Sequence, residues 1–392
     1  MKSNYRYIVK AFMAMAVIAG TTSCDDFLDR EPMSSISPET YYSTAAQLEA
    51  NLNDEYPNVL PSFGQWTYGI FGEDKGTDNQ IEVNANDRYT QDRWKVPHSE
   101  SDNWKFERIY RINFFLSEAL PKFGEDMSGS QNTISGSVAT IKHYIGEMYF
   151  LRAYEYFKKL QLFGDFPIID QPLADEMEAL REASKRFPRN EVARFIISDL
   201  DKAYAYMSDV DMATTRINKD VAMLVKSRVA LFEATWLQNF KGTAFVPGGE
   251  GWPGASLHNN YQYPSGNIDN EVKYFLEQAV EASKLVADKY KGSLTENTGV
   301  LQQSADDPSN PYFDMFAQED LSDVKEVLLW RQYARGLSTH NINAAAGRGN
   351  YRIGLTRGFV QNFLMKDGTP VYAHGSYADG DGYYMGDKTV AD

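Results

Sequence analysis

One long amphipathic helix constrains the fold of this chain more than any other sequence feature. From about Ile134 to Phe163, apolar side chains recur at three- and four-residue steps, which is the spacing of one helix face. That stripe consists of Ile141, Ile145, Met148, Leu151, Tyr156 and Leu160. At roughly 1.5 Å per residue the helix would be about 45 Å long, with Gly164 as its C-terminal cap. Such a stripe is buried most readily against other helices, so we expect a mainly helical fold.

Five further segments show the same helical spacing. They are residues 45–56, 104–120, 190–207, 219–237 and 270–290. We expect Pro121 to end the second of these helices, and Asn190 and Asp269 to cap the N-termini of the third and fifth. The helices come in pairs joined by short or medium loops, which is typical of helical hairpins such as tetratricopeptide repeats, although a strict repeat period is missing. The sequence therefore predicts a scaffold over 45–56, 104–237 and 270–290.

Loop-rich insertions interrupt and follow these helices. Residues 57–103, 239–267 and 292–392 are rich in Gly, Asn and Asp, and loops of that length in a compact protein are usually functional. Few strands are expected. The best candidate is Val324–Arg331, and short strands are also predicted at 167–170 and 369–372.

The N-terminus predicts a secretory signal that ends at a lipid-modified cysteine. Lys2, Arg6 and Lys10 precede the apolar run 11–19 and the small residues before Cys24. The run is too short to span a bilayer, which needs about 20 apolar residues. Cys24 is the only cysteine, so we expect neither disulfides nor a cysteine-based metal site. Residues 1–23 are thus predicted as a signal peptide, and 24–392 as one domain anchored through Cys24 to a membrane.

Charge and motifs argue against several functional classes. The formal net charge is −15, which disfavours binding to nucleic-acid phosphates. The five histidines are scattered, and neither an HExxH motif, a GxSxG nucleophile elbow nor a phosphate loop is present. Acidic residues are so frequent that any carboxylate pair is weak evidence for a glycosidase. We therefore expect a protein that is not an enzyme and that needs neither a metal nor another cofactor.

Aromatic side chains in the polar loops indicate carbohydrate binding. A flat ring packs against the C–H face of a sugar, while carboxylate, amide or guanidinium groups bond its hydroxyls. The candidates for a glycan site are Trp66, Asp78, Arg93, Trp94, Trp252, Tyr261 and Tyr263. Alternatively, these rings pack the loop region. Trp104 and Trp236 lie on helix stripes and are predicted as core residues, whereas the position of Trp330 in a candidate strand indicates neither role.

Several stretches, in order along most of the chain, resemble the SusD/RagB family of outer-membrane lipoproteins of the Bacteroidetes. The most specific is Gly146–Tyr154 (GEMYFLRAY). The others are Cys24–Pro32, Ile36–Tyr42, Trp104–Asn113, Leu162–Ile169, Pro188–Asn190, Asp199–Ala203, Lys219–Phe232 and Phe363–Pro370. Family members usually continue past the last of these into further helices. This sequence departs there, so we expect either a fold that ends in a loose tail or a chain that is truncated at its C-terminus.

The resemblance implies both a fold and a place in the cell. The fold would consist of tetratricopeptide-like helix pairs in a right-handed superhelical scaffold, with a loop-rich lobe and a few short strands. Arg152 and Tyr154 match a family motif on the long helix and would belong to the scaffold. The protein would be lipid-anchored at the cell surface, where it would cap a SusC-like, TonB-dependent transporter and capture a nutrient for import.

Three functions remain open from the sequence. The first is capture of oligosaccharides or polysaccharide, which the loop aromatics favour. The second is capture of peptides, as in the RagB branch that the resemblance includes. The third is a helical-repeat scaffold without a small ligand, which predicts that Trp66, Trp94 and Trp252 are buried or scattered. Glycan capture predicts instead that at least two of these three rings share one exposed face.

Overall fold

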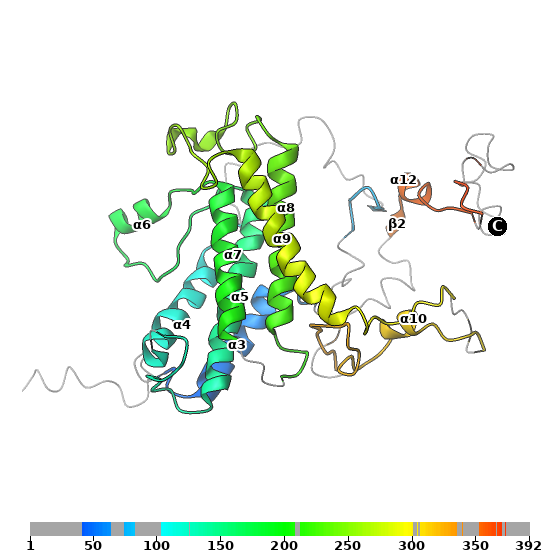
Figure 1. Cartoon of the computed structure of the whole chain (residues 1–392), viewed down its shortest axis with the longest axis horizontal. Helices are drawn as coiled ribbons and strands as arrows, with labels where there is room; N and C mark the ends of the chain where they lie inside the picture. Colours follow the sequence, from blue (N-terminus) through cyan, green and yellow to red (C-terminus); the bar gives the residue numbers. More distant parts are fainter. Residues whose placement is uncertain are drawn as a thin grey trace, which may run out of the picture.

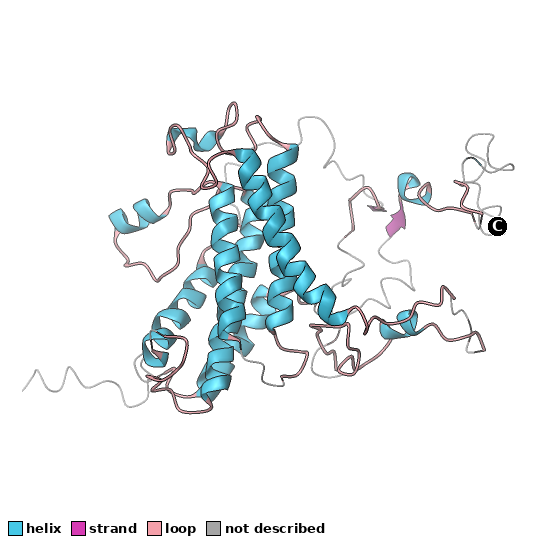
Figure 2. Ribbon diagram, in the orientation of Figure 1, coloured by secondary structure: helices cyan, strands magenta, loops and turns pink. Residues whose placement is uncertain are grey.

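Long helices form one body in the computed structural model, and short elements from the C-terminal part lie beside it (Figures 1 and 2). The structure describes residues 41–63, 74–82, 103–124, 126–207, 212–300, 304, 306–334, 339, 353–365, 367–370 and 373. In chain order, the elements are α3 (Ala45–Val59), β1 (Gln80–Glu82), α4 (Glu107–Phe123), α5 (Val138–Phe163), α6 (Met177–Ala183), α7 (Arg189–Tyr206), α8 (Lys219–Asn239), the 3-10 helix η3 (Pro253–Ser256), α9 (Ile268–Tyr290), α10 (Pro311–Met315), β2 (Ile353–Leu355) and α12 (Arg357–Val360).

Helix α5 is delimited by a serine cap and a left-handed glycine. The Ser137 hydroxyl accepts a hydrogen bond from the Thr140 amide, so the helix begins at Val138, slightly later than the sequence pattern indicated. Gly164 has φ 68°, a conformation that glycine adopts readily, and its amide donates to the Leu160 carbonyl. The prediction of Gly164 as the C-terminal cap is confirmed.

Two other predicted helix boundaries are wrong. Pro121 lies inside α4, which continues to Phe123, because bonding goes on past the proline: the Gly124 amide donates to the Leu120 carbonyl at 3.0 Å. Asp269 does not cap α9. Instead, the side chain of Asn267 accepts a hydrogen bond of 2.9 Å from the Asn270 amide.

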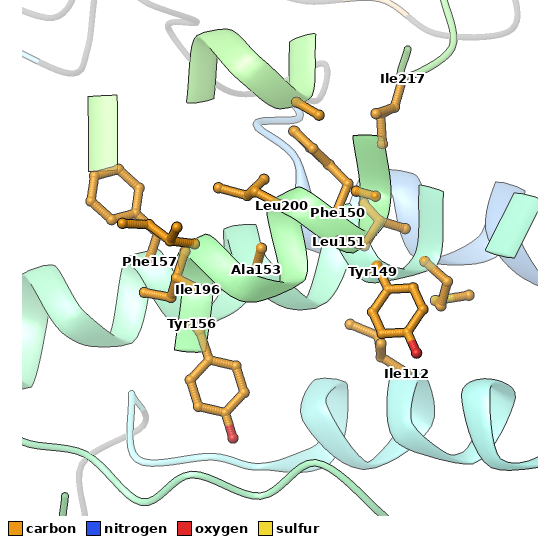
Figure 3. Close-up of a cluster of buried hydrophobic side chains, with 14 of the residues drawn as sticks. Ile112, Tyr149, Phe150, Leu151, Ala153, Tyr156, Phe157, Ile196, Leu200 and Ile217 are labelled. Atoms are coloured by element: carbon orange, nitrogen blue, oxygen red, sulfur yellow. The ribbon is translucent and has the colours of Figure 1, made fainter. Parts of the chain in front are cut away.

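Helix α5 runs through the centre of the hydrophobic core. The sequence indicated one apolar stripe, but nearly every face of this helix is buried between residues 141 and 160. Figure 3 shows part of this core, where α5 side chains lie among those of α4, α7 and the loop before α8; it labels Ile112, Tyr149, Phe150, Leu151, Ala153, Tyr156, Phe157, Ile196, Leu200 and Ile217. Close packing on α7 requires Gly146, because a Cβ atom there would lie 2.8 Å from the Met207 amide nitrogen and 2.9 Å from the Ala203 carbonyl oxygen.

A buried ion pair fixes α5 against α7. Arg152 donates to both carboxylate oxygens of Asp199, at 2.6 and 2.8 Å. Its remaining terminal nitrogen donates to the Asn113 side chain and the Asp170 carbonyl, each at 2.9 Å. Both members of the pair are almost inaccessible to solvent. The prediction that Arg152 belongs to the scaffold is therefore confirmed.

The helices pack as the sequence predicted for a mainly helical fold of tetratricopeptide-like pairs. Helix α5 contacts α3, α4 and α7, while α7 packs on α8 and α8 packs on α9. Figure 1 shows α7, α8 and α9 side by side, running from the top to the bottom of the view. Among the described residues, none of the helices combines the length and apolarity that a bilayer span requires.

The short strands differ from the predicted ones. β1 and β2 pair antiparallel, with Ile81 opposite Gly354, although both lie in regions expected as loops. The predicted strand Val324–Arg331 is wrong. That segment consists of turns and extended chain, because it bonds to separate residues, Thr214, Asn218 and Thr295, rather than to a neighbouring strand. Near the other predicted strands the structure has only isolated bridges, one of them Phe166 with Phe187.

Candidate binding pocket

A hollow of about 630 Å³ lies on the side of the helical body. We call it the Trp330 pocket. It lies between the end of α3, the middle of α5, the first half of α8 and the segment 329–332. Its volume falls in the usual range for small-molecule sites. Its walls are Asn53, Tyr56, Pro57, Leu60, Pro61, Phe150, Tyr154, Thr215, Val221, Val225, Leu329, Trp330, Arg331 and Gln332.

Helical spacing places the apolar walls of the pocket. Phe150 and Tyr154 are four residues apart on α5, and so are Val221 and Val225 on α8, so each pair shares one helix face. The Phe150 ring is buried, and the Tyr154 ring stacks on it with 6.1 Å between centroids and 16° between planes. Tyr154 itself is half-buried and lines the hollow. The scaffold helix thus also presents an aromatic surface to the pocket.

Three hydrogen bonds hold the segment that carries Trp330. The indole Nε1 donates to the Thr214 hydroxyl at 2.8 Å, and the Trp330 amide donates to the Thr214 carbonyl at 3.2 Å. Asn218, the N-cap of α8, donates from its side chain to the Leu328 carbonyl at 2.9 Å. These bonds connect a loop to the start of α8. They fix Trp330 as a half-buried wall of the pocket.

A buried carboxylate supports the base of the pocket. Glu147, which is fully buried, accepts hydrogen bonds from Arg216 at 3.0 and 2.8 Å and from the Tyr56 hydroxyl at 2.7 Å. The Tyr56 oxygen also accepts from the Ile217 amide at 2.9 Å. Arg216 donates further to the Asn53 side chain at 2.8 Å. The network therefore positions two pocket-lining residues, Asn53 and Tyr56, against the loop before α8.

The electrostatics of this network keep Tyr56 a hydrogen-bond donor. Burial raises the pKa of Tyr56 well above its ordinary value, and the negative charge of Glu147 raises it further. The hydroxyl therefore stays protonated at neutral pH and donates to Glu147. Burial also disfavours the charged form of Arg216, but hydrogen bonds to Glu147 and the negative charge of Glu147, with smaller contributions from Tyr56 and Tyr144, together raise the pKa of Arg216. Arg216 therefore stays charged around neutral pH and donates to Glu147.

The pocket combines ring faces with polar groups at its edge. Tyr154 and Trp330 supply half-buried aromatic surface. Asn53, Thr215 and Gln332 supply amide and hydroxyl groups that both donate and accept hydrogen bonds. This set suits a ligand with an apolar face and many hydroxyls.

Sequence analysis missed this pocket. Trp330 was placed in a candidate strand, and Tyr154 was assigned to the scaffold alone. One signal was available, since Trp330 stands between apolar Leu329 and polar Arg331, as residues at a pocket edge often do. The hydrogen bond between Trp330 and Thr214 joins residues 116 positions apart, and nothing in the local sequence indicates it.

The rings of the predicted 239–267 insertion connect that insertion to the helices. Trp252 is only 5% exposed, and its Nε1 donates to Asp165 at 2.7 Å. The Tyr263 hydroxyl donates to the Pro247 carbonyl at 2.6 Å. Trp252 also lines a second hollow, of about 620 Å³, together with Trp236. Both tryptophans are therefore held in place by the scaffold, and Trp252 keeps one edge toward this hollow.

Tyr261, in the same 239–267 insertion, is hydrogen-bonded to Asn190. The two side chains exchange hydrogen bonds of 2.9 and 3.1 Å, and Asn190 also donates to Glu271 at 3.1 Å. Asn190 lies inside α7, where Pro188 holds the N-cap position, so its predicted role as a cap is wrong. The amide joins α7 to α9 and to the insertion instead.

The remaining predicted site residues are not brought to either hollow. Asp78 is exposed in the turn before β1, and its carbonyl accepts a hydrogen bond from the Thr356 hydroxyl. It is not among the residues that line the Trp330 pocket or the Trp252 hollow. Cys24, Trp66, Arg93 and Trp94 lie outside the described residues. Within the described part of the chain, no cluster of three His, Cys, Asp or Glu side chains could hold a metal ion.

Comparison with known proteins identifies the family. The profile of a family described as "Starch-binding associating with outer membrane" matches residues 26–231, which is more than half of the chain. The chain belongs to the SusD-like family. This agrees with the resemblance seen in the sequence, and it covers the helices from α3 to most of α8.

SusD-like relatives are similar over part of their length. SusD-like protein P2 of Formosa agariphila is 25% identical over 253 residues, which is 62% of this chain and 46% of that protein. SusD-like protein P25 of the same organism is 25% identical over 233 residues, or 55% of this chain and 41% of that protein. The chain thus spans somewhat less than half the length of these curated relatives.

A solved structure supports the fold. The crystal structure of a SusD-like carbohydrate-binding protein from Bacteroides fragilis superposes with a TM-score of 0.52 at 14% identity. The superposition covers 86% of this chain and 57% of the other. At this identity, the likeness shows that the two chains share the SusD-like fold.

Proposed function

We propose that this SusD-like chain is a non-catalytic glycan-binding protein of the outer membrane, and that it holds an oligosaccharide in the Trp330 pocket. The observation that carries the proposal is the pocket itself. Half-buried Trp330 and Tyr154 line a hollow of about 630 Å³ together with hydroxyl and amide groups. The family description, which names starch binding, supports a carbohydrate as the ligand.

The pocket has the two kinds of contact that a sugar needs. The aromatic walls give the C–H face of a pyranose a flat apolar surface to pack against. Asn53, Thr215 and Gln332 provide both donors and acceptors, so each sugar hydroxyl has a partner of either kind. Because Asn53 is held by Arg216 and Trp330 by Thr214, binding requires little further ordering of these side chains.

The pocket composition supports capture rather than cleavage. Hydrolysis of a glycosidic bond normally uses two carboxyl groups that flank the bond. The described residues that line the Trp330 pocket include neither an aspartate nor a glutamate. A glycan bound there would therefore be released intact.

Anchoring and delivery complete the proposal. The family is described as associating with the outer membrane. A lipid on Cys24 would hold the chain there, and a SusC-like, TonB-dependent transporter would receive the glycan.

A tagged full chain, purified from its native membrane in mild detergent, should bring a transporter of this class with it. Recovery of the chain alone under several detergents would argue against this partnership.

Affinity electrophoresis of the full chain tests glycan capture. The panel contains neutral, uronate-containing and sulfated polysaccharides, and we expect at least one to retard the protein. Trp330→Ala should then weaken binding about tenfold, since stacking on an aromatic ring contributes about 1–3 kcal/mol. Phe316→Ala, which truncates a ring that is 72% exposed and remote from the pocket lining, is the matched control.

Two results would overturn the assignment. If a folded wild-type chain is retarded by no polysaccharide but binds peptides, then peptide capture replaces glycan capture. If a polysaccharide binds equally well to wild type and to Trp330→Ala, then the ligand lies elsewhere on the chain.

A further inference from the structure

The charge of the Trp330 pocket differs from that of the chain as a whole. The chain has 54 acidic and 39 basic side chains, which gives a net charge of −15. The described residues that line the pocket include no acidic side chain and one basic side chain, that of Arg331. The pocket is thus locally positive on a protein that is otherwise strongly negative.

Arg331 is available to a ligand. Its side chain is exposed at the pocket wall, directly after Trp330. Its guanidinium lies 5.6 Å from the centroid of the Tyr333 ring, which restrains it without neutralising its charge. None of the ion pairs formed within the described part of the chain includes Arg331. A planar guanidinium of this kind can donate two parallel hydrogen bonds to a carboxylate or sulfate.

A second guanidinium lies next to the same aromatic wall. Arg228 follows Val221 and Val225 at seven- and three-residue steps on α8, so it lies on the helix face that borders the pocket. Burial raises the pKa of the Tyr154 hydroxyl, and the positive charge of Arg228 partly offsets this rise. Arg228 is exposed and forms no ion pair with the described carboxylates.

From these observations we infer that the glycan held in the Trp330 pocket is acidic, with a uronate carboxylate or a sulfate ester that Arg331 and Arg228 bind. The inference rests on the proposed function, because it names the class of glycan for that site. A neutral sugar would offer the two guanidiniums only hydroxyl oxygens as acceptors, without an opposite charge. An anionic group would gain charge-assisted hydrogen bonds from them while its ring contacts Trp330 or Tyr154.

Matched ligands test the inference on the full chain. One pair is an oligogalacturonate and its carboxyl-reduced, neutral form, and the other is a κ-carrageenan oligosaccharide and its desulfated form. Binding is measured by calorimetry for wild type, Arg331→Gln, Arg228→Gln and the control Arg181→Gln, which changes an exposed arginine on α6. The polysaccharide panel described above is run on the same four proteins.

We expect the acidic member of at least one pair to bind about tenfold more tightly than its neutral form, since a hydrogen bond to a charged group contributes about 1.5–3 kcal/mol. Arg331→Gln and Arg228→Gln should each remove most of that preference, whereas Arg181→Gln should retain it. Sensitivity to salt should fall in the same two variants.

The contrary results separate this inference from the proposed function. If neutral polysaccharides bind with dependence on Trp330 while acidic ligands bind no better, then the acidic class is wrong and glycan capture at this pocket stands. If acidic ligands bind equally well to wild type and to both arginine variants, then the assignment of Arg331 and Arg228 as the anion-binding residues is wrong. If no polysaccharide or oligosaccharide binds the folded chain, both proposals fail.

Discussion

Replacing Glu147 with glutamine should disrupt the base of the Trp330 pocket. Three donors converge on this buried carboxylate: the Nε and Nη2 atoms of Arg216 and the Tyr56 hydroxyl, at 2.7–3.0 Å. Glutamine has nearly the same shape but offers one oxygen and one NH2 group. Whichever way the amide is oriented, its NH2 group faces an N–H donor of Arg216.

The expected cost follows from those contacts. The variant loses one charge-assisted hydrogen bond to Arg216, and it leaves the Arg216 charge without its buried partner. Each hydrogen bond to a charged group contributes about 1.5–3 kcal/mol, and removal of one partner of a buried pair typically costs about 3–5 kcal/mol. We therefore expect Glu147→Gln to lower the free energy of unfolding by about 3 kcal/mol.

Urea unfolding followed by circular dichroism measures this loss through the shift in transition midpoint at constant slope. Glu182→Gln, which alters an exposed pair with Lys185, should remain within about 0.5 kcal/mol of wild type. Glycan affinity should also fall in Glu147→Gln, because Asn53 and Tyr56 lose their supports. A loss below about 1 kcal/mol, with the same slope and an unchanged affinity, would refute the role of Glu147 as the support of the pocket.

Three further changes test other parts of the structure. Trp252→Phe retains a ring but removes the donor to Asp165, and urea unfolding should show a loss of about 1–3 kcal/mol; no loss would contradict that hydrogen bond. Burial alone would raise the pKa of Glu271, but hydrogen bonds from Arg194 and other donors lower it below the ordinary 4.5. The stability that the Glu271 carboxylate contributes is therefore present above pH 4.5 and lost as the pH falls. The stability advantage of wild type over Glu271→Gln should shrink between pH 6 and 3. A constant difference would contradict the assignment. Cys24→Ala should move the chain from the membrane fraction to the soluble fraction, and unchanged fractionation would exclude the lipid anchor.

The sequence predicted the helices well because their signals are local. Apolar spacing located α5, and Gly164 marked its end, since a left-handed C-terminal residue favours glycine whatever surrounds it. Cap identity was harder to predict. Asn190 and Asp269 are good capping residues, but Asn190 is engaged by Tyr261 and Glu271, and the Asp269 carboxylate pairs with Lys241.

The pocket was harder to predict because long-range contacts create it. Trp330 is positioned by Thr214, and Asn53 by Arg216, 163 residues away in sequence. Neither contact follows from spacing or propensity. The loop tryptophan Trp252 looked exposed because its neighbours are glycines and prolines, yet Asp165 binds its indole and leaves it 5% exposed. Local composition thus located the aromatic residues without showing which of them stay accessible.

A structure of the full chain with the oligosaccharide that the electrophoresis panel selects would test the central claim most directly. Our account predicts a sugar ring in contact with Trp330 or Tyr154, with hydroxyls bonded to Asn53, Thr215 or Gln332 and no bond cleaved. A ligand that occupies the Trp252 hollow or another surface, with the Trp330 pocket empty, would contradict it.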